Sequence, residues 1–250
     1  MRETFADHFS RVAGAYAEHR PRYPPELFAW LASLAPGRSL AWDCATGNGQ
    51  AAAGLAGHFA RVIATDASAD QLAAARPTPG VEYRVARSEQ SGLESATADL
   101  VTVAQALHWF DLPAFYAEVR RVLVGEGVVA AWTYRGATLN HPQLTGAVER
   151  FMLETVGPYW PSERWFVQSG YQTLPFPFKE IAAPPFVMQA QWTMDQLVAY
   201  VGTWSAVGRY RDVTGRDPLP LLVADLSASW GPPGDSRLVT WPVNLRAGRV

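Results

Sequence analysis

A glycine turn that directly follows a short buried strand is the feature that most constrains this chain. Residues 39–50 read SLAWDCATGNGQ, in which an apolar run ends at the carboxylate of Asp43 and is followed by Gly47, Gly49 and an alanine-rich segment. This order predicts a strand, a turn and a helix. Glycine has no Cβ, so the turn can adopt positive φ and let a ligand approach the backbone, and open α/β sheets bind ligands beyond the carboxyl ends of their strands. We therefore expect a nucleoside-containing cofactor at this turn.

Strands and helices alternate from this stretch through residue 134. Ser68 is placed to cap one helix, which Pro77 is expected to end. Asp111 is placed to cap another, which Gly125 is expected to end. Continuous apolar runs are typical of parallel strands that are covered on both faces, and right-handed crossovers join such strands into a doubly wound sheet. The predicted fold class is therefore α/β with a mostly parallel sheet, and its further strands are expected at residues 61–66, 81–85, 99–107 and 128–132.

Two helices are expected before this core, and an insertion is expected after it. One apolar stripe ends at Tyr16, and a second runs from Leu27 to Leu34 with Pro25 suited to its first turn. Residues 135–179 are rich in aromatic residues and proline. We expect this insertion to lie over the ligand-binding end of the sheet.

The C-terminal part is predicted to add helices and edge strands. Residues 193–196 have capping-box spacing and begin a helix whose stripe continues to Trp204, and another helix begins near Pro218. Two extended segments are expected at 181–192 and 238–245, the second at a sheet edge because it contains Pro242. We predict one domain, 1–250, with lid helices (1–38), a cofactor-binding core (39–134), an acceptor-side insertion (135–179) and C-terminal helices and edge strands (180–250).

Composition argues against several classes of partner. The 21 basic and 23 acidic residues give a formal net charge of -2 without a long basic run, which argues against nucleic-acid binding. The single cysteine, Cys44, cannot form an internal disulfide, and neither a secretory signal nor an apolar run of membrane-spanning length is evident. The histidines lack metal-ligand spacing, so no metal is expected. We predict a soluble cytoplasmic protein, monomeric or homodimeric, that binds neither nucleic acid nor membrane.

Two cofactors fit the glycine turn. Residues 47–52 match the G-x-G-x-x-A pattern of dinucleotide folds, and Asp66 lies near the spacing of a ribose-binding acid, which leaves a nicotinamide-dependent oxidoreductase open. That interpretation puts a pyrophosphate against the turn, where the charge of Asp43 would oppose it. S-adenosylmethionine carries an ammonium and a sulfonium group and no phosphate, so Asp43 favours this cofactor.

From about Phe5 to Tyr134, the sequence resembles the class I S-adenosylmethionine-dependent methyltransferases. The turn from Asp43 to Gly49 is similar to that family's acidic residue followed by G-x-G-x-G, with Ala45 in place of the first glycine. The resemblance implies an antiparallel edge formed by the last two strands. It also implies that Asp66 receives the ribose hydroxyls and that Ser88 and Glu89 line the adenine pocket. The full set of predicted cofactor-binding residues is Tyr16, Asp43, Ala45, Gly47, Gly49, Asp66, Ser88, Glu89 and Gln105.

A narrower resemblance is to trans-aconitate methyltransferases, a small-molecule, methyltransferase type 11-like subgroup. It rests on Tyr16, on residues 20–24 (RPRYP) and on residues 105–111 (QALHWFD), and with residues 204–210 and 245–249 it extends over nearly the whole chain. Tyr16 is expected to reach the cofactor or the acceptor from a lid helix. The predicted acceptor contacts are Tyr23, Trp109, Tyr134, Arg135 and Trp160.

His108 is the candidate catalytic residue, because a histidine after the fourth strand can take a proton from an acceptor. If the acceptor is a carboxylate, which is already ionised near neutral pH, no base is needed and His108 has only a structural role. We predict methyl transfer from S-adenosylmethionine, giving S-adenosylhomocysteine, to a small organic acceptor whose methylated atom is a carboxylate oxygen. A nicotinamide-dependent oxidoreductase and a non-catalytic S-adenosylmethionine-binding module are the alternatives.

Overall fold

The computed structural model describes residues 20–232 and 234–250, and the chain forms two compact units. Of the described residues, unit 1 holds 20–22, 135–164, 187–232 and 234–241, and unit 2 holds Tyr23–Tyr134, Trp165–Phe186 and Pro242–Val250. Each unit is therefore assembled from segments that are distant in sequence. The predicted first helix, which includes Tyr16, lies outside the described residues.

Unit 2 contains the predicted α/β sheet. The strand order is β3-β2-β1-β4-β5-β9, in which β1 to β5 are parallel, β9 is antiparallel to β5, and β7 is antiparallel to β9. The mostly parallel sheet with antiparallel pairing at its edge is the fold class that the sequence predicts. The strands are β1 (Leu40–Cys44), β2 (Arg61–Asp66), β3 (Val81–Val85), β4 (Ala98–Ala104), β5 (Leu123–Tyr134), β7 (Lys179–Ile181) and β9 (Arg237–Arg249), of which unit 2 holds the part from Pro242.

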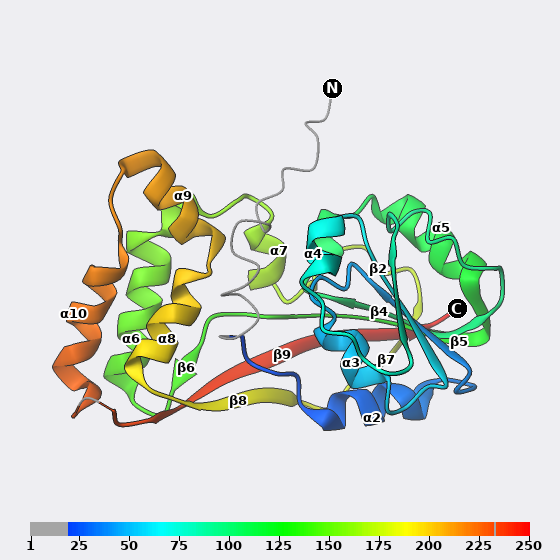
Figure 1. Cartoon of the computed structure of the whole chain (residues 1–250), viewed down its shortest axis with the longest axis horizontal. Coiled ribbons are helices and arrows are strands. Elements are labelled where there is room, and N and C mark those ends of the chain that lie inside the picture. The colour runs from blue at the N-terminus through cyan, green and yellow to red at the C-terminus, as the bar shows by residue number, and fades with distance from the viewer. Residues whose placement is uncertain (1–19, 233) are drawn as a thin grey trace. The chain divides into compact units, whose positions relative to one another are not determined.

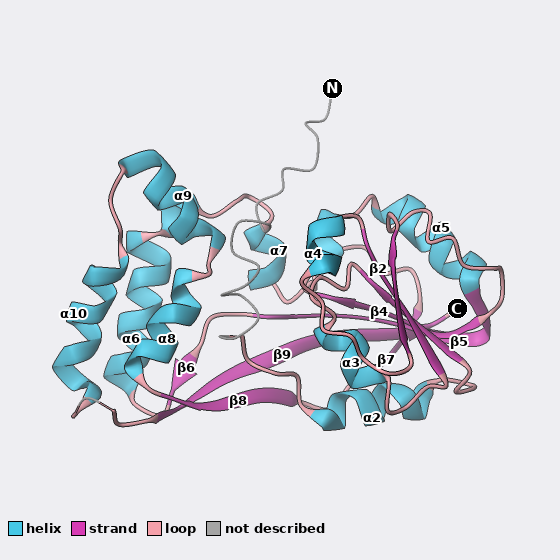
Figure 2. Ribbon diagram, viewed as in Figure 1, coloured by secondary structure: helices cyan, strands magenta, loops and turns pink. Residues whose placement is uncertain are grey.

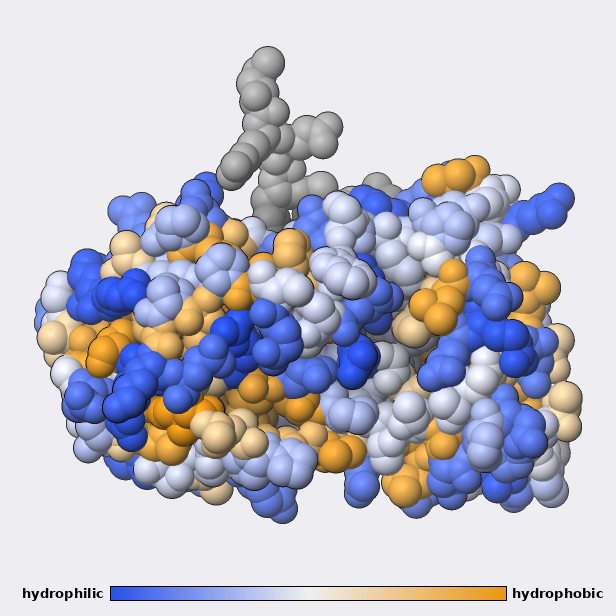
Figure 3. All heavy atoms as spheres, turned by 180° about the vertical axis from the view of Figure 1, so that it is seen from behind, coloured by the Kyte–Doolittle hydropathy of each residue, from blue (hydrophilic) through white to orange (hydrophobic). Residues whose placement is uncertain are grey.

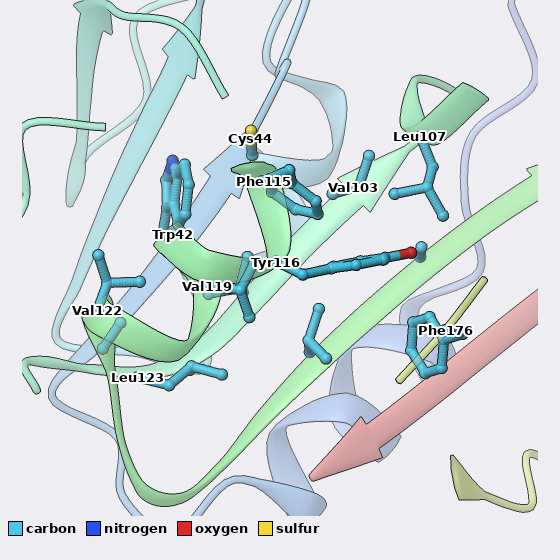
Figure 4. Packing of buried hydrophobic residues seen from close by; sticks show 14 of the residues in the cluster. Trp42, Cys44, Val103, Leu107, Phe115, Tyr116, Val119, Val122, Leu123 and Phe176 are labelled. Carbon is cyan, nitrogen blue, oxygen red and sulfur yellow. The ribbon is translucent and has the colours of Figure 1, made fainter. Parts of the chain in front are cut away.

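Helices cover both faces of this sheet because successive strand residues point to opposite sides. Ala41 packs with α2 (Pro25–Leu34) and α3 (Gln50–Leu55), whereas its neighbour Trp42 packs with α5 (Leu112–Val122). Figure 1 shows α2 and α3 on one side of the strands and α5 on the other. Figure 4 shows the α5 side, where the helix residues Phe115 and Val119 face strand residues such as Trp42 and Val103. The short helix α4 (Ala69–Ala73) follows β2.

Local sequence signals account for most of the helix starts. Pro25 occupies the first turn of α2, where its missing N–H has no intrahelical partner to lose. The Ser68 hydroxyl accepts a hydrogen bond from Gln71 N at the start of α4, and the Asp111 carboxylate accepts one from Ala114 N at the start of α5. These caps confirm the sequence-based predictions.

Two boundaries around α5 differ from the prediction. The strand expected at residues 99–107 ends at Ala104, because Gln105 has φ 62° and leaves the extended region. Leu107–Trp109 then form the single 3-10 turn η2. The helix expected to end at Gly125 ends at Val122, because Leu123 is already extended, with φ -71° and ψ 140°. Gly125 therefore lies inside β5.

The expectation that Pro242 places its strand at a sheet edge was wrong. Strand β9 pairs with β5 from Val243 to Arg249, and β7 pairs with the same strand at residues 247–249. Pro242 is tolerated because it lies between the segment that pairs with β5 and the segment, Val239 and Thr240, that pairs with β6.

Unit 1 is mainly helical (Figure 2). Thr193 and Gln196 form the predicted capping box at the start of α8. That helix ends at Gly202, so Trp204 does not continue its stripe as expected but precedes the next helix. Its elements are β6 (Thr138–Leu139), α6 (Pro142–Arg150), the π-helical turn η3 (Phe151–Thr155), η4 (Gly157–Tyr159), β8 (Phe186–Trp192, from Val187 on), α8 (Met194–Gly202), α9 (Ser205–Thr214) and α10 (Leu219–Trp230). Helix α7 (Arg164–Gln168) belongs to unit 2 apart from Arg164.

Aromatic side chains form much of the packing in unit 1. The Trp204 ring centroid lies 5.6 Å from that of Trp160, 5.9 Å from that of Tyr200 and 6.5 Å from that of Phe151. Trp192 and Trp241 add an edge-to-face pair at 4.8 Å. Such pairs contribute about 0.5–1.5 kcal/mol each beyond the burial of their area.

No helix among the described residues is both long and apolar enough to cross a membrane. On the face shown in Figure 3, hydrophobic residues lie in separate patches that hydrophilic residues divide.

Candidate functional site

The turn between β1 and α3 is built from three residues in the left-handed region. Ala45 has φ 54°, Gly47 has φ 56° and Gly49 has φ 83°. The Thr46 N–H donates to Thr65 O at 2.9 Å, and the Gly49 N–H donates to Thr46 O at 3.0 Å, so the turn is held to β2 and to itself. The sequence departure at Ala45 therefore leaves the turn geometry in place but puts an alanine in a conformation that costs about 1–2 kcal/mol.

The two glycines of the turn have different steric surroundings. A Cβ built on Gly49 would overlap the Tyr83 hydroxyl and lie 2.9 Å from its ring, so glycine is required there. A Cβ on Gly47 would meet only Gln71 Oε1, at 3.8 Å. The turn is thus closely packed at Gly49 and open at Gly47, which is where a ligand can approach the backbone.

Asp43 lies beneath this turn with both carboxylate oxygens hydrogen-bonded. Thr46 Oγ1 donates to Oδ2 at 2.5 Å, and Thr102 Oγ1, on the neighbouring strand β4, donates to Oδ1 at 2.7 Å. The side chain is fully buried. Burial raises the pKa of Asp43 to about 6, against the lowering effect of the two hydroxyls. At pH 7 the group is therefore mostly ionised, and it supplies negative charge at the base of the turn.

Asp66, at the end of β2, connects the turn after β1 to the turn after β2. Its Oδ2 accepts from Gly47 N at 2.9 Å, and its Oδ1 accepts from Ser68 N at 2.9 Å. Burial raises the pKa of Asp66, and the backbone hydrogen bonds oppose this effect. A carboxylate has about four acceptor positions, so each oxygen retains capacity for a ligand hydroxyl.

Ser88 and Glu89 follow β3, at the same end of the sheet. Ser88 Oγ donates to Glu89 Oε1 at 2.9 Å, and Arg87 Nε lies 3.3 Å from Glu89 Oε2. Partial burial raises the pKa of Glu89, but hydrogen bonds from its own backbone, from Ser88 and from Arg87 outweigh burial and hold the pKa below its usual range. Glu89 is therefore an ionised acceptor at neutral pH.

Gln105, after β4, is fixed against β5. Thr133 Oγ1 donates a short hydrogen bond to Gln105 Oε1, the Gln105 backbone N–H donates to Trp132 O at 2.9 Å, and its Nε2 donates to Tyr134 O at 3.4 Å. These bonds hold a non-glycine residue at positive φ. Asp43 and Asp66 thus lie at the carboxyl ends of β1 and β2, and Ser88, Glu89 and Gln105 follow the carboxyl ends of β3 and β4. In open parallel sheets this edge is where ligands bind.

His108 lies in the 3-10 turn η2 and is paired with a tyrosine that is distant in sequence. Its Nδ1 is 2.9 Å from the hydroxyl of Tyr171, and the two ring centroids are 5.7 Å apart. The Trp109 ring lies 4.7 Å from the imidazole. Tyr171 is fully buried and has φ 64°.

The predicted acceptor contacts fall into two groups. In unit 2, the Tyr23 ring lies 5.5 Å from Trp132 and 6.4 Å from Tyr134, and Trp109 is partly exposed beside His108. In unit 1, Arg135 is exposed, whereas Trp160 packs on Trp204 and donates its Nε1–H to Met152 O at 3.1 Å. The structure therefore brings Tyr23 and Tyr134 together and places Trp109 beside His108. Tyr16 lies outside the described residues.

Two further observations bear on the chemistry. Cys44 is buried in the hydrophobic core, and burial raises the pKa of its thiol well above its usual range, so the thiol stays protonated. Within residues 20–232 and 234–250, no three His, Cys, Asp or Glu side chains gather into a metal-binding group.

Sequence reasoning missed Thr46, Thr102, Thr133 and Tyr171. The three threonines hold Asp43 or Gln105 through hydroxyl donors. Thr102 and Thr133 lie in buried strands, where no sequence signal separates this role from packing, and Thr46 lies in the turn itself. Tyr171 contacts His108 across 63 positions of sequence. Only the folded chain brings these two residues together.

This sheet order, with a glycine turn after β1 and acids at the carboxyl ends of β1 and β2, defines a Rossmann-like α/β domain. A family model described as a methyltransferase domain matches residues 42–131. A candidate methyltransferase from Dictyostelium discoideum is 32% identical over 247 residues, which are 96% of this chain and 94% of that protein. An uncharacterized methyltransferase of Mycobacterium tuberculosis is 32% identical over 142 residues, which are 56% of this chain and 58% of that protein.

Among solved structures, a candidate type II methyltransferase from Anaeromyxobacter dehalogenans has a TM-score of 0.87 at 47% identity, covering 92% of this chain and 97% of that chain. The chain therefore belongs to the class I methyltransferase family, whose members transfer the methyl group of S-adenosylmethionine.

Proposed function

We propose that this methyltransferase binds S-adenosylmethionine at the turn between β1 and α3 and methylates a carboxylate oxygen of a small organic acid. The observation that carries the cofactor assignment is the pairing of an open glycine with two buried acids: Asp66 Oδ2 accepts from the N–H of Gly47, and Asp43 lies directly below the same turn. The local charge is negative, which suits the cationic methionine end of S-adenosylmethionine and opposes a pyrophosphate.

Each predicted cofactor residue has a role in this proposal. The backbone at Ala45, Gly47 and Gly49 borders the methionine end, and Asp66 accepts from the ribose hydroxyls. Ser88 and Glu89 border the adenine, and Gln105 borders the cofactor after β4. Tyr16 completes the proposed set from sequence alone.

S-adenosylmethionine supplies an activated methyl group. S-adenosylhomocysteine is the product that remains once this group has been transferred. The protein's own contribution is mainly alignment of the acceptor oxygen with that methyl group, which is worth about 7–11 kcal/mol in well-oriented reactions. An ionised carboxylate loses no proton on methylation, so this reaction needs no base, whereas a hydroxyl or amine acceptor would transfer a proton to His108. Tyr23, Trp109 and Tyr134, which all lie in unit 2, are the proposed acceptor contacts.

The resemblance to trans-aconitate methyltransferases supports a carboxylate acceptor. That resemblance rests on residues 20–24 and 105–111, which include Tyr23, His108 and Trp109. Incubation with S-adenosylmethionine labelled in the methyl group, together with a metabolite extract, identifies the acceptor by mass spectrometry. A labelled methyl ester supports the proposal. A labelled ether or amine as the main product contradicts the carboxylate assignment, and S-adenosylmethionine binding without any transfer favours a non-catalytic binding module.

Asp66→Asn tests the cofactor site. Asparagine keeps a side-chain oxygen for Gly47 N or Ser68 N but loses the charge. Alanine would remove both anchors of the turn and confound binding with folding. A charged hydrogen bond contributes about 1.5–3 kcal/mol, so calorimetric titration is expected to show roughly 10- to 100-fold weaker S-adenosylmethionine binding.

Asp99→Asn is the matched control for that variant. Asp99 Oδ2 also accepts from two backbone amides, Ser39 N at 2.8 Å and Leu40 N at 3.1 Å, but at the amino end of β1. We expect Asp99→Asn to lower stability while S-adenosylmethionine affinity stays within about twofold. Equal affinity in the Asp66→Asn variant and the wild type would remove Asp66 from the site.

A further inference from the structure

The pair formed by the half-buried His108 and the fully buried Tyr171 contains a hydrogen bond whose direction decides what the histidine can do. A neutral imidazole has one nitrogen that donates and one that accepts. Nδ1 of His108 is 2.9 Å from the Tyr171 hydroxyl. If Nδ1 accepts, Nε2 carries the proton and is a donor; if Nδ1 donates, Nε2 is an acceptor and can act as a base.

The chemistry of the two groups favours the first arrangement. A phenol is a stronger acid than a neutral imidazole, and an imidazole nitrogen is a stronger base than a phenol oxygen. The stronger neutral hydrogen bond therefore runs from the Tyr171 O–H to His108 Nδ1. This direction leaves the proton of the neutral ring on Nε2.

The backbone around Tyr171 is held in a costly conformation that keeps the hydroxyl in place. Tyr171 has φ 64° and directly follows Gly170, which has φ 63°. The Tyr171 N–H donates to Phe166 O at 2.9 Å, and Arg246 Nη1 donates to Tyr171 O at 3.0 Å. A bulky residue persists in the left-handed region only where the surroundings fix it.

Arg246 is itself fixed from two further directions. Its Nη1 also donates to Leu174 O at 2.8 Å, and its Nη2 pairs with Glu180 Oε1 at 2.6 Å. The guanidinium is almost fully buried. The segment that carries the Tyr171 hydroxyl is therefore pinned to β9, and the phenol has little freedom to turn away from His108.

We propose that Tyr171 is a positioning residue that sets the tautomer of His108, so that the neutral imidazole presents Nε2–H as a hydrogen-bond donor to an anionic acceptor and does not act as a base. This inference rests on the proposed function and narrows it, because a donor at this position matches an acceptor carboxylate. A hydroxyl or amine acceptor, which must lose a proton, would need the opposite tautomer.

Nitrogen-15 NMR of the full chain, with its histidines labelled, tests the tautomer of His108 and needs no methyl acceptor in the sample. The His108 signals are assigned by their loss in His108→Gln, and spectra are recorded at a pH where the imidazole is neutral. We expect the Nε2–H tautomer in the wild type and a mixture of tautomers in Tyr171→Phe, which keeps the ring but removes the hydroxyl. An Nδ1–H tautomer in the wild type, or an unchanged tautomer in Tyr171→Phe, would overturn the proposal.

Tyr116→Phe is the matched control. Tyr116 is buried in the same hydrophobic cluster, and its hydroxyl donates to Pro175 O at 2.6 Å. This variant also loses one hydroxyl hydrogen bond from the core, so it measures the structural effect alone. We expect it to keep the wild-type His108 tautomer. A tautomer change in both tyrosine variants would mean that core loosening, and not the contact with His108, is responsible.

Ligand titrations test the second half of the proposal, that His108 Nε2–H donates a hydrogen bond to an anionic acceptor. Acetate, benzoate and trans-aconitate are the probes, added in the presence of S-adenosylhomocysteine. At least one is expected to shift the His108 Nε2–H signal, with roughly tenfold weaker binding in Tyr171→Phe. If the wild type has the expected tautomer but none of the three probes moves the signal, the anion-binding role is overturned while the tautomer assignment stands. If the labelled-methyl experiment yields no ester, the proposed acceptor fails, and the NMR result still decides the role of Tyr171.

Discussion

Ala45, in the turn between β1 and α3, has a strained backbone conformation. Ala45 has φ 54°, and the methyltransferase motif that this turn resembles has glycine at the same position. Replacing it by glycine removes the steric cost of the left-handed conformation, and the greater freedom of glycine in the unfolded chain offsets part of that gain. We expect Ala45→Gly to raise the free energy of unfolding by about 1 kcal/mol, measured by urea denaturation.

Ala96→Gly is a suitable comparison, because Ala96 also has φ 54° but lies in an exposed turn. Both variants should be stabilised. A decrease in stability for Ala45→Gly alone would mean that the Cβ of Ala45 makes contacts that outweigh its backbone strain.

Asp43 is expected to make stability depend on pH between about 4 and 6. Its pKa is raised by burial from 3.8 to about 6, so folding favours the protonated form. The stabilising contribution of that form is complete below pH 3.8 and is lost as the pH rises through about 6. Between pH 4 and pH 7, the wild type should therefore lose about 2 kcal/mol of unfolding free energy relative to Asp43→Asn, which does not titrate.

Thr102→Val sharpens this test, because the Thr102 hydroxyl lowers the pKa of Asp43. Without that donor, the pH window should move upward. Parallel stability curves for wild type and Asp43→Asn across this range would show that Asp43 does not titrate there.

In the wild type, S-adenosylmethionine affinity should fall as Asp43 becomes protonated below about pH 6, because the attraction for the cationic ligand is lost.

Sequence reasoning identified the charged and glycine residues of the candidate site but not their partners. Asp43 and Asp66 were predictable because a carboxylate directly after a buried apolar run has few structural reasons to be there. The glycine turn identified Gly47 and Gly49, and the motif placed Ala45 at a glycine position, but only the folded chain shows that Ala45 adopts the left-handed conformation of a glycine. The hydroxyl donor Thr102 depends on strand register, which only the paired sheet determines, whereas Thr46 contacts Asp43 through the local fold of the turn.

At the scale of elements, the α5 helix is attached to the β3–β4 connection by one carboxylate. Glu118 Oε1 accepts from Ser91 N at 2.9 Å and from Ser91 Oγ at 2.5 Å, and both carboxylate oxygens pair with Arg121 at 2.7 Å. Hydrogen bonds from Arg121 are the main reason that the pKa of Glu118 is lowered to about 2. The stability that this group contributes is present above pH 4.5 and is lost as the pH falls toward 2.

We expect Glu118→Gln to lower the free energy of unfolding by about 2 kcal/mol at pH 7, because charged hydrogen bonds are lost. The difference from wild type should shrink below pH 4. Glu82→Gln is the control: the pKa of Glu82 is also lowered to about 2 by Arg84 and Arg61, but its ion pairs are solvent-exposed. Solvent screening makes such pairs weak, so a loss in Glu82→Gln as large as that in Glu118→Gln would contradict this account.

Element boundaries were predictable where a local signal exists. Ser68, Asp111 and the Thr193 capping box each begin a helix as expected. The end of α5 was not predictable, because Leu123 continues the apolar pattern of the helix while its backbone is already extended. Helix α9 was missed because it buries only Ala206 and Val207, which gives no regular apolar stripe.

At the scale of the whole molecule, ligand binding should raise the melting temperature, because only the native state has a cofactor site. S-adenosylmethionine at about 100 times its dissociation constant should add about 2.7 kcal/mol of stability, which corresponds to a rise of roughly 5–10 °C in a chain of this size. NAD at the same concentration should leave the melting temperature unchanged, since the charge of Asp43 opposes a pyrophosphate at the turn. A rise with NAD that equals or exceeds the rise with S-adenosylmethionine would contradict the cofactor assignment.

The division of the chain into two units makes this experiment more specific. Asp43, Ala45, Gly47, Gly49, Asp66, Ser88, Glu89 and Gln105 all belong to unit 2. If calorimetry resolves separate transitions for the units, S-adenosylmethionine should therefore raise the transition that includes the α/β sheet, which hydrogen exchange of the β1 and β4 amides identifies. Asp66→Asn should reduce that shift, whereas Asp99→Asn should keep it even though its starting melting temperature is lower. A ligand-induced shift confined to the other transition would mean that the cofactor binds outside the turn between β1 and α3.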